Sequence, residues 1–229
     1  MPRAHRERER IDRGRMSPPR RKARPKPDPI FAFLNIPFDQ QFEPLYLAFI
    51  AGLSGFGLIP QAVLQIPGSQ RRLDRLIDLL GTCQYSFHDL SRVELDSRRP
   101  KTPRFNMPFE LGLAVARAEH AHDGHRWYVL EAKRYRVVKS LSDINGTEAY
   151  IHGGTPTGVL RELTNALARA RHRPTVRELQ AVYRDVKRTA ATLKRDLATH
   201  TLFDTRPFQD LVLAASISAK QRIASLRAT

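Results

Sequence analysis

The chain has 229 residues and a formal net charge of +16. Its length and its 41% hydrophobic content suffice for one domain with additions, or for two small domains. Cys83 is the single cysteine, which excludes a disulfide framework within the chain and a zinc site of several cysteines. No secretory signal pattern is present, so we expect a cytoplasmic protein.

The positive charge lies at the two ends of the sequence. The net charge is +7 over residues 1–28, +1 over residues 29–160 and +8 over residues 161–229. We predict that residues 1–28 form a disordered basic tail, because they are rich in arginine and proline and contain almost no apolar side chains. Such a tail can bind nucleic acid or an acidic partner, or it can simply keep the protein soluble. Met16, inside this segment, is an alternative start to Met1.

The longest uncharged stretch runs from Pro44 to Gln70. It is interrupted by glycine and proline at Gly52, Gly55, Gly57, Pro60 and Pro67. No unbroken apolar segment of the ~18 residues that a membrane-spanning helix needs is left. We therefore expect no membrane contact, and we interpret the stretch as a buried helix, a glycine turn and a strand.

From residue 29 onward, strand-like and helix-like segments alternate. Short apolar runs predict strands over residues 30–36, 58–66, 83–90 and 126–132, with a short extension over 135–138. Apolar residues at helical spacing predict helices over residues 42–53, 70–80 and 108–119. This alternation predicts an α/β domain over residues 29–173, with a parallel sheet of about five strands flanked by helices.

Further helices are predicted toward the carboxyl terminus. One covers residues 158–170 and belongs to the α/β domain. Two more, over residues 175–199 and 208–226, make residues 174–229 a basic helical extension. The apolar stripe of the first of these can pack on the α/β domain, or it can associate with a second copy as a homo-oligomer.

Polar residues after the predicted strands are the candidate site, because open parallel sheets bind ligands beyond the carboxyl ends of their strands. Asn35, Phe38 and Asp39 follow the first strand, and Asp89 and Ser91 follow the third. Asp89 could orient a ribose hydroxyl or a base, or it could make a local turn or cap. The next loop holds Arg98, Arg99, Lys101, Arg104 and Asn106. Its basic side chains could bind phosphate, or they could be solvated.

Glu110 is the candidate catalytic residue. Pro108 at the first helical position puts Glu110 at the third, where the helix N-terminus favours an ionised carboxylate. Such a carboxylate can attack or stabilise an oxocarbenium-like sugar carbon. The alternative is that an acidic residue in the first turn only stabilises the helix.

Other chemistries have little support. The sequence contains neither GxGxxG nor GxxxxGK[ST], the phosphate-binding motifs of dinucleotide-binding and P-loop proteins. The run Glu119–His125 is rich in histidine but lies in a connection with no supporting ligand signature. We therefore predict neither a metal site nor a resident cofactor.

Two segments stand out, Tyr85–Ser91 (YSFHDLS) and Pro103–Ala114 (PRFNMPFELGLA). Together they resemble nucleoside 2-deoxyribosyltransferase-like proteins and bacterial TIR-like proteins, and Phe33–Asp39 also fits the first strand and loop of such a fold. In these families a strand ends near an acidic residue, and the helix after the next loop opens with an asparagine or a similar group. An ExGxA-like pattern follows in that helix, and its glutamate is catalytic. The resemblance covers residues 30–170, and its specific part spans Asp89–Arg117.

The resemblance implies a flavodoxin-like fold that cleaves or transfers an N-glycosidic bond of a nucleotide or of NAD. Glu110 would be the nucleophile or the oxocarbenium stabiliser, Asp89 and Asn106 would bind ribose or base, and Phe38 would pack on the ring. The basic stretch Arg98–Arg104 stands where the deoxyribosyltransferases have an acidic residue, which favours a phosphorylated small molecule. Two other functions remain open: a non-catalytic nucleotide-sensing or signalling module, and a nucleic-acid-binding protein that uses its basic ends.

Overall fold

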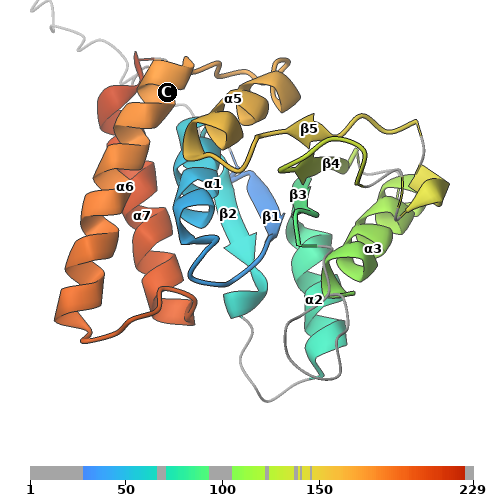
Figure 1. Ribbon diagram of the computed structural model, residues 1–229, viewed down its shortest axis with the longest axis horizontal. Helices are drawn as coiled ribbons and strands as arrows, with labels where there is room; N and C mark the ends of the chain where they lie inside the picture. Colours follow the sequence, from blue (N-terminus) through green and yellow to red (C-terminus); the bar gives the residue numbers. More distant parts are fainter. Residues whose placement is uncertain are drawn as a thin grey trace, which may run out of the picture.

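The computed structural model describes residues 28–65, 71–92, 105–121, 124–136, 139, 141–144 and 146–224. Figure 1 shows strands and helices alternating along the first two thirds of the chain. The strands are β1 (Phe31–Asn35), β2 (Ile59–Ala62), β3 (Tyr85–Asp89), β4 (Arg126–Glu131) and β5 (Tyr150–Ile151). The helices are α1 (Glu43–Gly55), α2 (Arg72–Thr82), α3 (Asn106–His120), α5 (Pro156–Ala166), α6 (Val176–Asp196) and α7 (Thr205–Arg222). All but one residue of the predicted basic tail lies outside the described residues.

The five strands form one sheet in the order β2-β1-β3-β4-β5, and every neighbouring pair is parallel. This confirms the predicted α/β fold, and the strand order is the flavodoxin-like one. The fifth strand lies elsewhere than expected. Tyr135, in the predicted extension, adopts a turn with a φ of 69°. The edge strand is instead Tyr150–Ile151, which pairs with Leu130 and Glu131 of β4.

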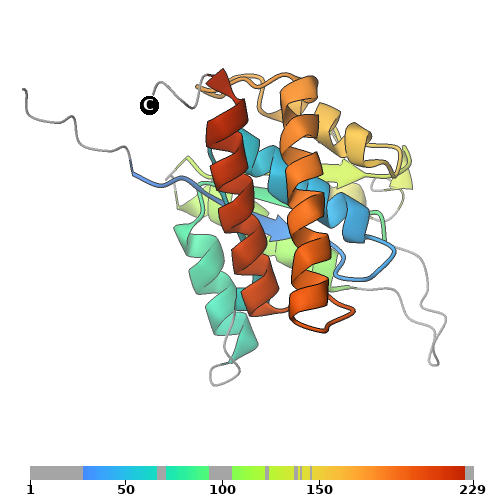
Figure 2. The same cartoon turned by 90° about the vertical axis from the view of Figure 1, so that its left-hand side faces the viewer.

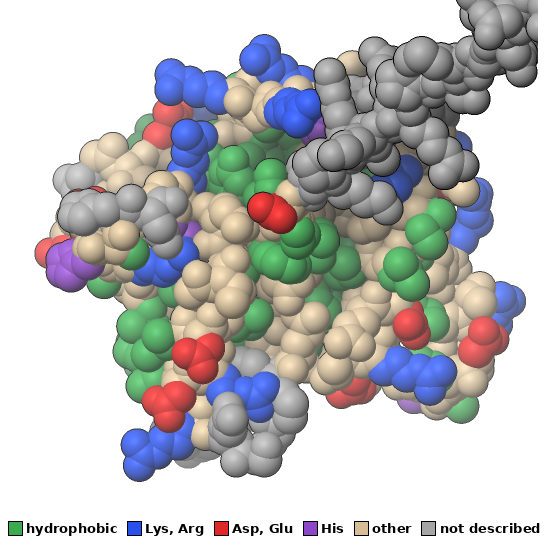
Figure 3. All heavy atoms as spheres, turned by 180° about the vertical axis from the view of Figure 1, so that it is seen from behind, with side chains coloured by type: hydrophobic (Ala, Val, Ile, Leu, Met, Phe, Trp, Pro, Cys, Tyr) green, Lys and Arg blue, Asp and Glu red, His purple; other side chains and the backbone are tan. Residues whose placement is uncertain are grey.

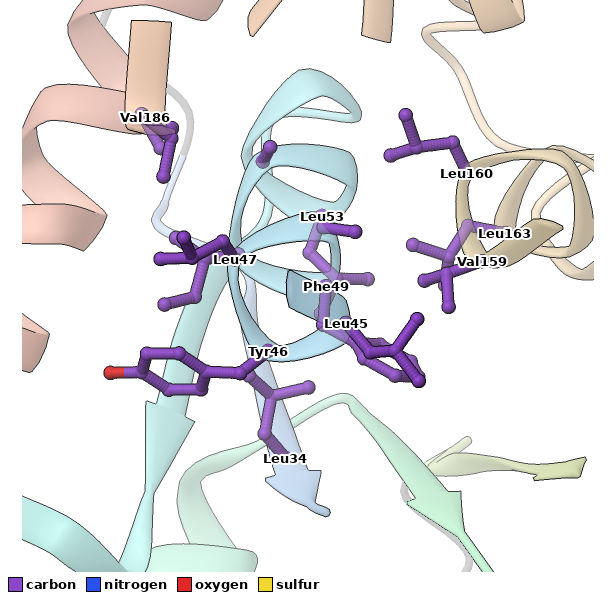
Figure 4. Close-up of a cluster of buried hydrophobic side chains, with 14 of the residues drawn as sticks. Leu34, Leu45, Tyr46, Leu47, Phe49, Leu53, Val159, Leu160, Leu163 and Val186 are labelled. Carbon is purple, nitrogen blue, oxygen red and sulfur yellow. The ribbon is translucent and has the colours of Figure 1, made fainter. Parts of the chain in front are cut away.

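Helix α1 is the centre of the larger hydrophobic core, where it packs against other helices on two sides (Figure 4). Every residue from Leu45 to Gly55 is buried, so the helix needs apolar neighbours all the way round. In Figure 4, Val159 and Leu163 of α5 lie on one side of α1 and Val186 of α6 lies on the other. A Cβ on Gly52 would lie 2.5 Å from Leu163 Cδ1, so this glycine permits the close approach of α5.

Helices α6 and α7 run side by side over the outer face of α1 (Figure 2). Asp185 of α6 accepts a 2.6 Å hydrogen bond from Ser218 of α7 and pairs with Arg222. Lys194 of α6 donates a 2.7 Å hydrogen bond to Glu43 at the start of α1. The expected boundary between residues 173 and 174 falls in the connection before α6, and the helices beyond it share one core with the sheet.

Helices α2 and α3 cover the opposite face of the sheet. Phe33 of β1 packs there with Leu76 of α2, Ala114 of α3 and the buried Cys83. Burial raises the pKa of the Cys83 thiol to about 11, so this cysteine is a small apolar core residue. Helix α3 begins at Asn106, two residues earlier than the position of Pro108 predicts.

The described Lys and Arg side chains do not form one continuous patch on the face shown in Figure 3. On the face shown in Figure 3, Lys and Arg side chains lie around the edge, and the centre is mostly apolar or uncharged. Within the part of the chain that the structure describes, no helix combines the length and apolar character needed to cross a membrane.

Candidate functional site

The order of the strands places a crevice at the carboxyl ends of β1 and β3. The chain leaves β1 for α1 on one face of the sheet and leaves β3 toward α3 on the other, so the two connections diverge. Open α/β sheets bind ligands at this point. Asp39, after β1, accepts a 2.9 Å hydrogen bond from Arg92, after β3, and a 3.0 Å bond from the Phe42 N–H. The predicted site residue Asp39 therefore links the two loops through its ion pair with Arg92.

A cavity of about 310 Å³ lies beside this crevice, on the side of α2 and α3. It is lined by Phe38, Val63, Arg72, Asn106, Met107 and Glu110. Three of these residues, Phe38, Asn106 and Glu110, are predicted site residues. They come from the loop after β1 and from the first turns of α3, so the fold brings together residues that are some 70 positions apart.

Glu110 is a buried carboxyl group that opens onto the cavity. Its side chain belongs to a residue only 6% exposed, and no described residue forms a hydrogen bond with it. Burial raises the pKa of Glu110 to about 7, and the positive charge of Arg72 acts in the opposite direction. The sequence analysis expected Glu110 to be an ionised carboxylate in the first turn of the helix, and the structure differs on both points. Because α3 begins at Asn106, Glu110 is its fifth residue and lies beyond the first turn, where the helix dipole acts most strongly. Burial is the largest cause of the shift in its pKa.

The Phe38 ring is fixed in the cavity wall by other aromatic side chains. Its centroid lies 6.2 Å from that of Tyr46, edge to face, and 6.1 Å from that of Phe203. The Tyr46 hydroxyl donates a 3.2 Å hydrogen bond to the Leu202 carbonyl, which anchors the connection between α6 and α7. The carboxyl-terminal helices thereby support a ring that lines the cavity.

A buried chain of hydrogen bonds runs behind the cavity. Asn35 Nδ2 donates to the Met107 carbonyl at 2.8 Å and lies 2.9 Å from His88 Nδ1. His88 Nε2 lies 2.9 Å from Ser86 Oγ, which in turn lies 3.0 Å from His125 Nε2. Burial and the neighbouring His125 lower the pKa of His88 to about 3, so this imidazole is neutral. These hydrogen bonds tie β1, β3 and the residue before β4 to the first turn of α3.

Asp89 and Ser91 form a separate cluster with His152. Asp89 Oδ2 lies 2.9 Å from His152 Nε2, and both side chains are fully buried. The same Nε2 lies 3.2 Å from Ser91 Oγ, whereas His152 Nδ1 accepts a hydrogen bond from the Gly154 N–H. Because serine and aspartate approach the same imidazole nitrogen, the cluster lacks the arrangement of a catalytic triad. It pins the connection between β5 and α5 to the end of β3.

The predicted residues Asn35 and Asp89 thus lie on opposite faces of the sheet. Asn35 is buried behind the cavity, whereas Asp89 lies on the other side of the sheet, because neighbouring residues of a strand point to opposite faces. His88, a polar residue at the end of the third predicted strand to which the sequence analysis assigned no role, is the register partner of Asn35. Its position two residues after Ser86, which puts both polar side chains on one face of the strand, was a usable signal. Arg104 lies outside the described residues, together with the rest of its basic loop.

Arg72 and His152 were also missed by the sequence analysis. Arg72 was one of many arginines, and nothing local in the sequence indicates that the first residue of α2 lines a cavity with Glu110. His152 follows a strand of only two residues, Tyr150–Ile151, which the hydrophobic pattern did not reveal.

The described residues of the histidine-rich run Glu119–His125 do not gather into a cluster. His125 is buried and lies 2.9 Å from the Cys83 carbonyl, whereas His120 is exposed at the end of α3. His122 lies outside the described residues. In the described segments, three or more histidine, cysteine, aspartate or glutamate side chains nowhere come together in a group that could hold a metal ion.

The chain was compared with known proteins through family models and through curated sequences. No protein-family model matches it, and no curated protein does.

Proposed function

We propose that this protein cleaves or transfers the N-glycosidic bond of a nucleotide or of NAD, with Glu110 as the catalytic residue. The observation that carries the proposal is the position of Glu110: a buried carboxyl without a hydrogen-bond partner among the described residues, facing a cavity next to an aromatic ring and an amide. Structural carboxyl groups at such burial are normally paired. A pKa of about 7 also matches that of a carboxyl group that gains and loses a proton near neutral pH.

The proposed reaction breaks the bond between the anomeric carbon of ribose and a nitrogen of the base. The bonding electrons leave with the base, and the sugar carbon gains positive charge. The ionised Glu110 carboxylate stabilises this charge or forms a bond with the carbon. Water or an acceptor base then bonds to the carbon, displaces the carboxylate if it is bound, and loses a proton, while the departed base gains one. Phe38 would pack against a ring of the substrate, and Asn106, exposed at the edge of the cavity, would hydrogen-bond a hydroxyl group.

The size of the cavity is compatible with such a ligand. Pockets for small molecules span about 300–1,000 Å³, and this cavity, at about 310 Å³, is near the lower end. It would accommodate the sugar and one group attached to it, while the rest of the substrate extends into the crevice between β1 and β3.

The experiment is a base-release assay with the full-length protein. Wild type is incubated with NAD and a panel of nucleotides, and free base is detected by chromatography. We expect release by wild type and none by Glu110→Gln. Glu119→Gln, which removes an exposed carboxyl from the same helix, is the matched control and should keep full activity. Equal inertness of wild type and Glu110→Gln toward all these substrates would count against the proposal. Tight binding of an intact nucleotide would then favour the nucleotide-sensing module.

A further inference from the structure

Two helices begin at the same cavity. Arg72 is the first residue of α2, which has 11 residues, and Asn106 is the first residue of α3, which has 15. Both residues line the cavity that Glu110 faces. The residues that precede them, Arg71 and Phe105, make no side-chain capping hydrogen bond. Among the described residues, no side chain therefore caps these first turns, and in α3 the free N–H groups are those of Asn106 and Met107, because Pro108 has none. Both helix dipoles add partial positive charge to this side of the cavity.

Arg72 adds a full positive charge to the same wall. The residue is exposed, and its guanidinium forms no ion pair with a described residue. A guanidinium group presents a planar fork of donors that fits the oxygens of a phosphate. The one carboxylate in the first turn of α2 is the exposed Asp74, which does not line the cavity.

The buried carboxyl of Glu110 is the second sign that a ligand belongs here. Glu110 as a residue is only 6% exposed, and its carboxyl oxygens, which open onto the cavity, form no hydrogen bond with a described residue. Burying a polar group costs free energy unless a partner compensates for it. A ligand with a hydroxyl or phosphate oxygen within reach would supply that partner. Because the pKa of Glu110 is raised to about 7, below neutral pH its carboxyl adds little negative charge against an anion.

We propose that Arg72, together with the N-terminal turns of α2 and α3, forms a phosphate-binding subsite that makes the cavity select a phosphorylated sugar. The identity of the rest of the ligand rests on the proposed function, whereas the subsite itself does not. This assigns to Arg72 the role expected for the loop Arg98–Arg104, which lies outside the described residues. Helix N-termini with an adjacent cation are a recurrent way of binding phosphate in proteins.

The test uses the full-length protein at pH 6, with ribose 5-phosphate and ribose as a matched pair of probes and inorganic phosphate as a third. Binding is followed by the amide shifts of ¹⁵N-labelled protein in NMR titrations. We expect ribose 5-phosphate and phosphate to bind and to shift the amides at the starts of α2 and α3. We also expect ribose 5-phosphate to bind about tenfold or more tightly than ribose.

Arg72→Gln should remove this advantage, and Arg72→Lys should keep part of it, because it retains the charge but not the planar fork. The matched control is Arg71→Gln, which removes the same charge from the neighbouring exposed residue, one that does not line the cavity. Arg71→Gln should leave the affinity within about twofold of wild type.

Two results would overturn the subsite: no difference between ribose 5-phosphate and ribose, or equal losses in Arg71→Gln and Arg72→Gln. The second would mean that the +16 chain attracts phosphate through its overall charge. Base release without a phosphate preference would refute the subsite alone. Phosphate binding at Arg72 without any base release would refute the proposed function alone.

Discussion

Asn35 on β1 and His88 on β3 are register partners in the sheet, and the Asn35 amide nitrogen lies 2.9 Å from the His88 Nδ1 atom. The same amide nitrogen donates to the Met107 carbonyl in the first turn of α3. Since Met107 and Glu110 line one cavity, a fully buried histidine and asparagine hold the helix turn that carries the candidate catalytic residue. The imidazole of His88 can fulfil this role only while it stays neutral.

The stability of the fold should therefore fall on acidification. Burial lowers the pKa of His88 from 6.5 to about 3 in the folded protein. As the pH falls, His88 is therefore protonated near pH 6.5 in the unfolded chain but only near pH 3 in the folded one. Between these values, unfolding becomes steadily more favourable, by roughly 4–5 kcal/mol in total. His88→Gln should be less stable than wild type at pH 7 and should lose less stability between pH 6.5 and pH 4.

Urea unfolding at several pH values measures this difference. His120→Gln, which alters an exposed histidine on α3, is the control for a generic loss of a histidine. Parallel loss of stability in wild type and His88→Gln over this pH range would contradict the assignment.

Glu110 should destabilise the fold at alkaline pH. Its pKa is about 7 in the folded protein and 4.5 as an unperturbed carboxyl, so the unfolded chain releases the proton first as the pH rises. Folding stability is therefore lost between pH 4.5 and pH 7, by up to about 3 kcal/mol. Glu110→Gln removes this loss and should be more stable than wild type at pH 8, with the gain disappearing below pH 4.5.

Unfolding free energies at pH 4.5 and pH 8 give the comparison, and Glu119→Gln on the exposed face of α3 should show no such gain. A substitution that stabilises the fold while it abolishes base release would fit a site that trades stability for function. A Glu110→Gln protein less stable than wild type at pH 8 would mean that the carboxyl has a structural partner.

Helix α7 should contribute to the stability of the sheet. Phe208 is fully buried in the core that α1 shares with α6 and α7, so Phe208→Ala should cost about 3–5 kcal/mol. Trp127, the single tryptophan, lies on β4 and reports the unfolding of the sheet by its fluorescence. We expect the Trp127 transition to move to lower urea in Phe208→Ala and to stay in place in Leu213→Ala, an exposed position on α7. An unshifted Trp127 transition in Phe208→Ala would make α6 and α7 an independent unit.

Asp89 and Asp39 should differ in their effect on stability, although both follow strands at the crevice. Asp89→Ala leaves the fully buried His152 without its acidic partner and should cost about 3 kcal/mol. Asp39→Ala breaks a partly exposed ion pair with Arg92 and a bond to the Phe42 N–H, which together are worth roughly 1 kcal/mol. Thermal unfolding of the two variants gives the ranking, and the reverse order would show that the Asp89 cluster is only loosely packed.

Two glycines should respond in opposite ways to alanine. A Cβ on Gly158, in the first turn of α5, would lie 1.8 Å from the His152 carbonyl oxygen, so Gly158→Ala should cost about 3 kcal/mol. A Cβ on Gly112, on the exposed side of α3, would meet nothing within 4 Å. Gly112→Ala should therefore stabilise the protein by about 0.5–1 kcal/mol, because alanine favours the helix. Calorimetric melting temperatures distinguish the two, and a destabilised Gly112→Ala would indicate a contact at that face.

The helices and most of the strands were predictable because their signals are local. Alternation of short apolar runs with helical stripes predicts the parallel α/β sheet, and helices α1, α2 and α5 lie close to their predicted ranges. The strand Tyr150–Ile151 was not predictable, because two residues carry no periodic pattern. Thr175, which the sequence analysis includes in the helix, is instead the residue that caps α6.

The sequence by itself determined the fold class and selected Glu110 together with Phe38 and Asn106, all of which line one cavity. It could not show that Asp89 and Asn35 lie on opposite faces of the sheet, because this depends on the register between β1 and β3, whose partners Asn35 and His88 are 53 residues apart. Only the tertiary structure brings Arg72 to Glu110, and only it decides the protonation of the carboxyl. Burial raises the pKa of Glu110 to about 7, and burial is a property of everything that packs around the residue rather than of its place in the chain.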